Sequence, residues 1–150
     1  MKMTPELKRA QENMAPGIIT AEGFLGSDRR NLSTIIDEDG QVMRHLGLDS
    51  AEVAERLQFF MNEGRKGLGE PVTVEEEWLV QTDEARGHLA CPWEDGIRRK
   101  INVTVERKES GEKLFYTDLS IHLLEAHGFL EGRGSFFRLN LESVKHVLKL

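Results

Sequence analysis

The sequence predicts an α+β fold, in which a helical N-terminal half packs on an antiparallel sheet of three or four strands and two short C-terminal helices follow. Apolar residues recur at helical spacing in residues 5–65 and alternate with polar residues in residues 72–116. Helical spacing returns in residues 117–150. No internal repeat, low-complexity tract or long linker divides the chain, so we expect a single α+β domain over residues 1–150.

The composition is that of an acidic globular protein. A chain of 150 residues buries roughly two thirds of the surface that its unfolded form exposes. Its formal net charge of −6 disfavours nucleic acids and anionic membranes as partners. The one cysteine excludes an internal disulfide, and no apolar run reaches the roughly 18 residues of a membrane span. Because the start of the chain also lacks the apolar core of a secretory signal, we expect a soluble, cytoplasmic protein.

The first helix is expected to begin at Pro5 and to end near Gly17. Thr4 offers an N-cap hydroxyl, and proline is favoured at the first helical position because it needs no amide donor there. The charged sequence that follows indicates an exposed, peripheral helix.

The second helix is predicted to be capped by Ser27 or Asp28 and to end at Asp39-Gly40. Its apolar positions have helical spacing: Leu32, Ile35 and Ile36. Residues 41–46 form a further helical stretch, either as a separate helix or as the continuation of one bent helix.

The third helix carries the clearest signal. Asp49 and Glu52 form a capping box, which predicts a start at this point. The apolar positions that follow recur on one helical face: Val53, Leu57, Phe60 and Met61. Gly64 is expected to end the helix.

The sheet is predicted to begin with one strand over residues 72–80, because apolar residues alternate there with polar ones. A turn at residues 82–84 follows, and Pro92 and Glu109–Gly111 mark later interruptions. Between these, three further extended pieces are expected: His88–Cys91, residues 101–105 and Leu114–Tyr116.

The two C-terminal helices are marked by caps. Thr117 or Asp118 is predicted to cap the first, and Gly128 to end it. Its apolar positions are Leu119, Leu123, Leu124 and Ala126. Residues 136–139 are expected to be extended, after which Asn140 caps the last helix.

Four residues form the strongest candidate for a chemical site: His88, Cys91, His122 and His127. They provide the number of nitrogen and sulfur donors that a tetrahedral zinc site requires. Against a site, residues five apart on a helix point about 140° away from each other, and residues three apart on a strand lie on opposite faces. Alternatively, Cys91 is a buried apolar residue, or a reactive cysteine activated by a neighbouring base.

A second candidate is the loop that contains Gly132, Arg133, Gly134 and Ser135. Backbone amides in a glycine-rich turn bind anions, and arginine binds phosphate. The loop lacks the Lys-Ser/Thr ending of a phosphate-binding loop, and it does not open a helix. An ordinary connector is the alternative to this anion-binding cofactor site.

Nucleic-acid binding is a third hypothesis. The predicted helices at residues 41–46 and 51–61 are spaced like a winged helix-turn-helix, and Gly64–Gly67 has the form of the loop with which KH modules clamp a nucleic-acid backbone. Glu52 and Glu55 on the second helix would repel phosphates, so these charges disfavour a nucleic-acid partner.

The sequence therefore favours a non-enzymatic module that binds a protein or a small ligand. The protein partner can be a second copy of the same chain. The first alternative is a metal-binding protein or enzyme with zinc at Cys91, His122 and His127. The second is a nucleic-acid-binding protein of winged-helix-like arrangement. No catalytic motif identifies a reaction.

Overall fold

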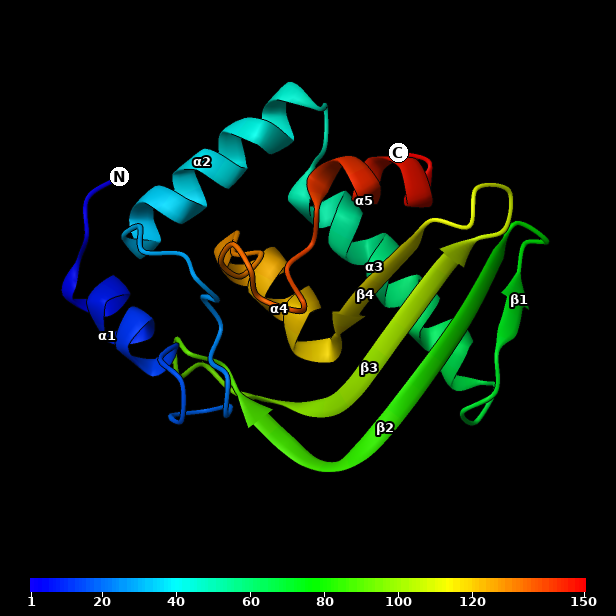
Figure 1. Cartoon of the computed structure of the whole chain (residues 1–150), viewed down its shortest axis with the longest axis horizontal. Helices are drawn as coiled ribbons and strands as arrows, with labels where there is room; N and C mark the ends of the chain where they lie inside the picture. Colours follow the sequence, from blue (N-terminus) through cyan, green and yellow to red (C-terminus); the bar gives the residue numbers. More distant parts are fainter.

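The computed structural model describes residues 1–150 and confirms the α+β class, with five helices and one sheet of four antiparallel strands (Figure 1). The elements in chain order are α1 (Pro5–Asn13), α2 (Leu32–His45), α3 (Ser50–Arg65), β1 (Val72–Val74), β2 (Trp78–Ala90), β3 (Ile97–Arg107), β4 (Lys113–Thr117), α4 (Asp118–His127) and α5 (Leu141–Leu148). No helix combines the length and the apolarity that crossing a membrane requires.

The sheet is a meander, because each strand pairs with the next in the order β1-β2-β3-β4. One row of apolar cross-strand partners runs over all four strands: Val72, Val80, Val105 and Leu114. Helices α3, α4 and α5 contact this face (Figure 1). The register of β2 against β3 shifts between Glu84 and His88, and the two strands curve strongly around the helices. Such an irregularity bends a strand and increases its twist.

The predicted single strand over residues 72–80 is in fact a hairpin. β1 and β2 are joined by a short turn in which Glu75 and Glu76 have positive φ. Val74 pairs with Trp78, so the apolar alternation continues through the turn on the same face. The predicted turn at residues 82–84 is likewise wrong, because these residues pair with β3 inside the long strand β2.

The start predicted for the second helix is also wrong. Helix α2 begins at Leu32, whose amide donates to the side chain of Gln11 in α1 at 3.0 Å. Asp28 does not cap it, because its carboxylate is bound by the guanidinium of Arg30. The helix then continues through Gly40 to His45 without a break, as the bent-helix alternative proposed. The extended piece predicted for residues 136–139 is also wrong, because residues 136 and 137 form a turn and residues 138 and 139 belong to no strand.

Four caps predicted from the sequence are confirmed: Thr4, Asp49, Thr117 and Asn140. Helix α4, which starts at one of them, lies between two apolar cores. The larger core fills the space between the sheet, α3 and α5, and includes Leu124. The smaller joins α1 and α2 to the turn between β2 and β3, and includes Leu123 and Cys91. The end of α4 is thereby held against that turn.

Candidate functional site

Four side chains that commonly bind metals meet where the turn between β2 and β3 packs on the last turn of α4. They are Cys91, Asp95, His122 and His127, and one donor atom of each lies within 4.8 Å of all the others. His127 Nε2 lies 2.8 Å from Asp95 Oδ2 and 3.7 Å from Cys91 Sγ. His122 Nε2 lies 3.0 Å from Asp95 Oδ1. The carboxylate of Asp95 is therefore the centre of the group.

The turn at residues 91–96 presents Cys91 and Asp95 on the same side. It is closed by a hydrogen bond from the amide of Cys91 to the carbonyl of Gly96, and by another from the amide of Glu94 to the carbonyl of Cys91. Helix α1 fixes the turn from outside, since Asn13 donates to the carbonyl of Pro92 at 2.8 Å. Cys91 is buried and also belongs to the smaller apolar core.

The two histidines reach the same carboxylate although they are five residues apart on a regular helix. Their rings are 5.3 Å apart and nearly perpendicular, with Asp95 in contact with both. Gly128 ends α4 directly after His127 in a left-handed conformation. The ring of Trp93 stacks on that of His127, with centroids 4.0 Å apart, and so fixes its orientation. Distortion of the helix is therefore not needed for convergence.

The protonation of the group disfavours Cys91 as a nucleophile. Burial and, to a smaller degree, the hydrogen bond with Asp95 raise the pKa of Cys91 to about 12, so the sulfur is a thiol at neutral pH. Burial also raises the pKa of Asp95, but its hydrogen bonds with Cys91, His122 and His127 bring that pKa well below its ordinary value. Moreover, one nitrogen of His127 faces both sulfur and carboxylate, whereas a catalytic relay uses the two ring nitrogens separately.

Arg98 is the outer partner of His122. Its Nη2 donates to His122 Nδ1 at 2.8 Å, and its buried Nε has no hydrogen-bond partner. Because a guanidinium only donates, Nδ1 of the neutral ring carries no proton and Nε2 carries it towards Asp95. The positive charge of Arg98 next to His122 will oppose a bound cation.

The structure brings together three of the four residues that the sequence proposed for a metal, and it places His88 elsewhere. His88 is exposed in β2, opposite Arg99 of β3. Asp95 takes the fourth place and was missed by sequence reasoning. The only local signal is its position in the short sequence Pro92–Gly96, which separates two extended segments and follows the cysteine.

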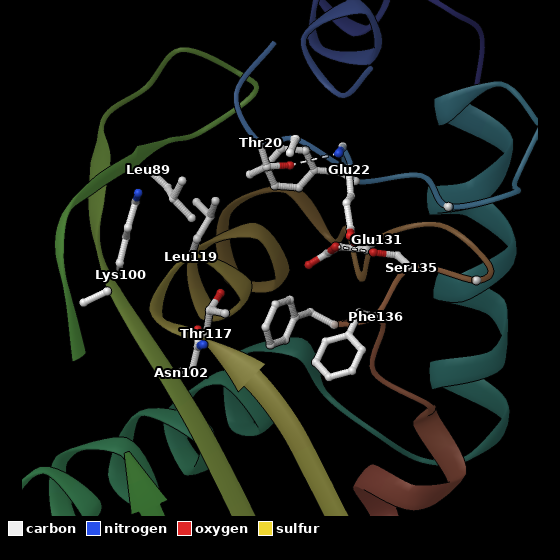
Figure 2. Close-up of a pocket in the computed structure, with 17 residues that line it drawn as sticks. Thr20, Glu22, Leu89, Lys100, Asn102, Thr117, Leu119, Glu131, Ser135 and Phe136 are labelled. Atoms are coloured by element: carbon white, nitrogen blue, oxygen red, sulfur yellow. Dashed lines mark hydrogen bonds between the residues drawn. The ribbon is translucent and has the colours of Figure 1, made fainter. Parts of the chain in front are cut away.

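A separate cavity of about 630 Å³ lies beside the smaller core. It is enclosed by the loop at residues 20–26, the ribbon of β2 and β3, the start of α4 and the loop at residues 131–137 (Figure 2). None of the four clustered residues lines it. Glu131, another residue that the sequence did not mark, has its carboxyl group at the cavity wall.

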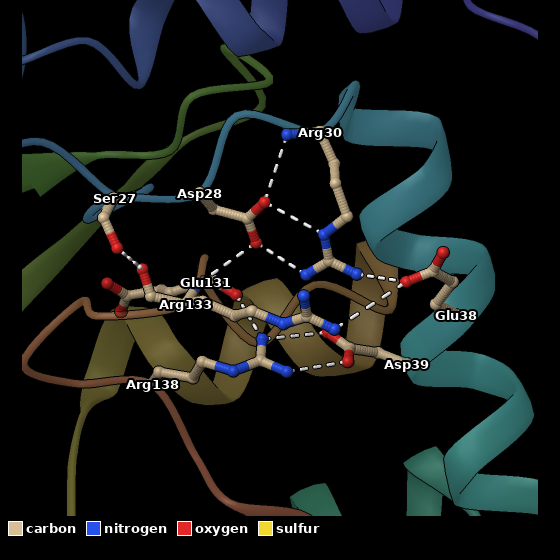
Figure 3. A network of polar contacts seen from close by, with 8 residues as sticks. All are labelled: Ser27, Asp28, Arg30, Glu38, Asp39, Glu131, Arg133 and Arg138. Atoms are coloured by element: carbon tan, nitrogen blue, oxygen red, sulfur yellow. Dashed lines mark hydrogen bonds and ion pairs between the residues drawn. The ribbon is translucent and has the colours of Figure 1, made fainter.

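The glycine-rich loop uses its hydrogen-bond donors inside the fold. The amide of Gly132 donates to the carbonyl of Phe24, and that of Arg133 to the carboxylate of Asp28 (Figure 3). The hydroxyl of Ser135 donates to Glu131. A free anion would have to displace an acidic side chain that is itself held by Arg30, so the loop is better explained as a connector than as an anion site.

Replacement of Gly132 by alanine is expected to lower the free energy of unfolding by about 1–3 kcal/mol. A Cβ atom at this position would lie 2.3 Å from the carbonyl oxygen of Leu25, which is backbone and cannot move aside. Gly40→Ala is the matched control, because a Cβ there meets only Arg44 at 3.5 Å inside a helix. The Gly40→Ala substitution should raise the free energy of unfolding by roughly 0.5–1 kcal/mol. Urea unfolding of both variants measures the two effects, and equal values would contradict the tight loop contact.

The structure gives no support to a nucleic-acid site on α3. Its apolar residues are buried against the sheet and α4, and the buried hydroxyl of Tyr116 donates to the carbonyl of Leu57 in the middle of the helix. Arg65 and Lys66 are paired with Glu84 and Glu63. The helix is therefore a core element and not an exposed recognition helix.

Comparison of the chain with protein-family models, with curated proteins and with solved structures gives no match.

Proposed function

We propose that this protein is a non-enzymatic binding module that holds a transition-metal ion, with zinc as the best fit, between Cys91, Asp95, His122 and His127. The observation that carries the proposal is the convergence of four donor atoms from two separate segments within 4.8 Å. Thiolate, imidazole and carboxylate are the ligands that zinc takes in proteins.

The distances support a tetrahedral arrangement. Ligands at 2.0–2.3 Å from zinc lie about 3.3–3.7 Å from one another. Cys91 Sγ and His127 Nε2 are already 3.7 Å apart. The 2.8 and 3.0 Å separations between Asp95 and the histidines are those of hydrogen bonds, and a small outward movement would replace these bonds by metal coordination. Binding releases the proton of Cys91, and each neutral imidazole coordinates through Nε2 with its ring proton on Nδ1.

The metal's proposed role is structural. Four protein ligands complete a tetrahedral shell and leave no position for a substrate, as in other closed zinc sites. Cys91 is buried, and the histidine side chains are only 13% and 15% exposed. The ion would link the turn between β2 and β3 to the end of α4. A reducing cytoplasm would keep the single cysteine available as a ligand.

The direct test is elemental analysis of tag-free protein purified without chelators. Wild type and the control His88→Ala should carry close to one zinc ion per chain, and His122→Ala/His127→Ala should carry almost none. Zinc at the same level in all three proteins, or in none of them after addition of zinc, would refute the proposal. In the second case Asp95 serves only as a hydrogen-bonded link between the turn and α4.

Arg98→Met is expected to strengthen zinc binding by about tenfold, as outer-shell changes commonly alter metal affinity by this amount or more. The change removes both a cation beside His122 and the donor that keeps Nδ1 free of a proton. Arg99→Met removes the same charge from an exposed position in the adjacent residue and is the control. Competition with a chromophoric chelator measures both affinities. Weaker binding in Arg98→Met would show that Arg98 supports the metal-binding conformation of His122.

A further inference from the structure

The cavity of about 630 Å³ has the size of a small-molecule site, since such sites are commonly about 300–1,000 Å³. Its apolar wall consists of side chains from four segments: Phe24, Leu89, Leu119, Phe136 and Phe137. Phe136 lines the cavity and is 72% exposed (Figure 2), and its ring packs edge-on against that of Phe137. An aromatic ring in this position presents a face that an apolar ligand would cover.

Glu131 is the buried charged group of the cavity, whose lining also includes two exposed charged residues, Glu22 and Lys100. The residue is only 7% exposed, and its Oε1 accepts a hydrogen bond from Ser135 at 2.6 Å. Its Oε2 has no hydrogen-bond partner in the protein. This oxygen is not fully buried, so it keeps some accessible surface. The free oxygen therefore faces the open space of the cavity, as Figure 2 indicates.

The neighbouring cation, Arg138, makes no hydrogen bond with this carboxyl group. Arg138 is occupied by a two-pronged ion pair with Asp39, whose Oδ1 lies 2.8 Å from Nη2, and by the backbone carbonyl of Glu131 (Figure 3). Glu131 itself has a positive φ of 73°, which is uncommon for a residue with a side chain. The fold thus holds a strained, buried acidic residue at a cavity wall without a counter-ion in contact with its carboxylate. Strained residues of this kind gather at binding sites.

We infer that this cavity binds an amphipathic organic amine, whose aromatic or alicyclic body packs between Leu119 and Phe136 and whose N–H donates to Oε2 of Glu131. The amine supplies the missing counter-ion, and a charge-assisted hydrogen bond in a partly desolvated site is stronger than a neutral one. The inference stands apart from the proposed metal function, because it uses none of the metal-binding residues.

The test compares two fluorescent naphthalene probes of similar size, the amine propranolol and the carboxylate naproxen, by titration calorimetry and by NMR chemical shifts at pH 7.5. We expect propranolol to bind at least tenfold more tightly than naproxen. Its shifts should map to residues 20–26 and 131–137. Glu131→Gln should weaken propranolol binding at least tenfold and leave naproxen unchanged, and Phe136→Ala should weaken both probes.

Phe136 is exposed, so Phe136→Ala tests the cavity without a risk to folding. Glu22→Gln removes an exposed acid from the same lining and controls for a general charge effect. The inference is overturned if both probes bind equally well, if neither binds, or if Glu22→Gln weakens propranolol as much as Glu131→Gln does. Loss of binding through changes at His122 and His127 alone would place the amine at the metal cluster and would also overturn it.

Discussion

Zinc added to metal-free protein is expected to raise the free energy of unfolding by about 4 kcal/mol when free zinc exceeds its dissociation constant a thousandfold. For a domain of 150 residues, each 1 kcal/mol of unfolding free energy raises the thermal unfolding midpoint by roughly 2–4 °C. The midpoint should therefore rise by about 8–16 °C. The ligands come from the turn after β2 and from α4, which are 27 or more residues apart in the chain. An unfolded chain does not hold them together, so the metal binds mainly to the folded state.

The measured quantity is the increment that zinc adds to each protein, because ligand substitutions also change the stability of the metal-free form. The substitution Asp95→Asn leaves the two histidines without their common anion. The substitution Cys91→Ser replaces the sulfur ligand and changes a residue in the smaller core. Both variants should lose most of the zinc increment, whereas His88→Ala should keep all of it. An equal increment in His88→Ala and Asp95→Asn would mean that zinc binds at another place on the acidic surface.

The helix caps show which part of the fold can be predicted from sequence. At Thr4, Asp49 and Asn140 the capping oxygen binds an amide three residues further on, so all the information is local. The prediction for the start of α2 is wrong because Leu32 is capped by Gln11 from another helix, a contact that exists only after folding. Local chemistry predicts a helix start, and tertiary contacts replace it where they compete.

The strand error at residues 72–80 has a different cause. Val74 and Trp78 pair directly across a three-residue turn, so the side chains before and after the turn lie on one face of the sheet. Apolar alternation has the same period in a continuous strand and in such a hairpin. Only the left-handed backbone conformation of Glu75 and Glu76 distinguishes the hairpin from a continuous strand. Glutamate, unlike glycine, does not indicate that conformation in a sequence.

Three donors of the candidate site were predictable from the sequence, whereas the fourth donor and the arrangement of the site were not. Cysteine and histidine are few in this chain, so Cys91, His122 and His127 are visible in the sequence. Asp95 is one of 26 acidic residues, and its position in the short sequence after Cys91 is the only local signal that marks it. Its role follows from the packing of the β2–β3 turn on α4, and the same packing leaves His88 outside the group.

Rising pH is expected to destabilise the protein between about 4.5 and 7 through Glu131. Burial raises the pKa of this carboxyl group to about 7, although the hydrogen bond from Ser135 and the charge of Arg138 act to lower it. The folded protein therefore keeps a proton that the unfolded chain has already lost, so the unfolded state binds fewer protons and stability falls as pH rises. The contribution is fully present below 4.5 and is lost as the pH passes through 7, with a magnitude of roughly 3 kcal/mol.

Urea unfolding at several pH values between 4 and 8 tests this expectation. Glu131→Gln cannot ionise, so it should match wild type at low pH, exceed it by roughly 3 kcal/mol at pH 8, and show a flatter profile. Ser135→Ala removes the hydroxyl that favours the charged form, and should move the loss of stability to higher pH. Identical profiles for wild type and Glu131→Gln would contradict the burial of this group. A cation bound at Oε2 would stabilise the ionised carboxylate, so a saturating amine should reduce the loss at pH 8 in wild type and leave Glu131→Gln unaffected.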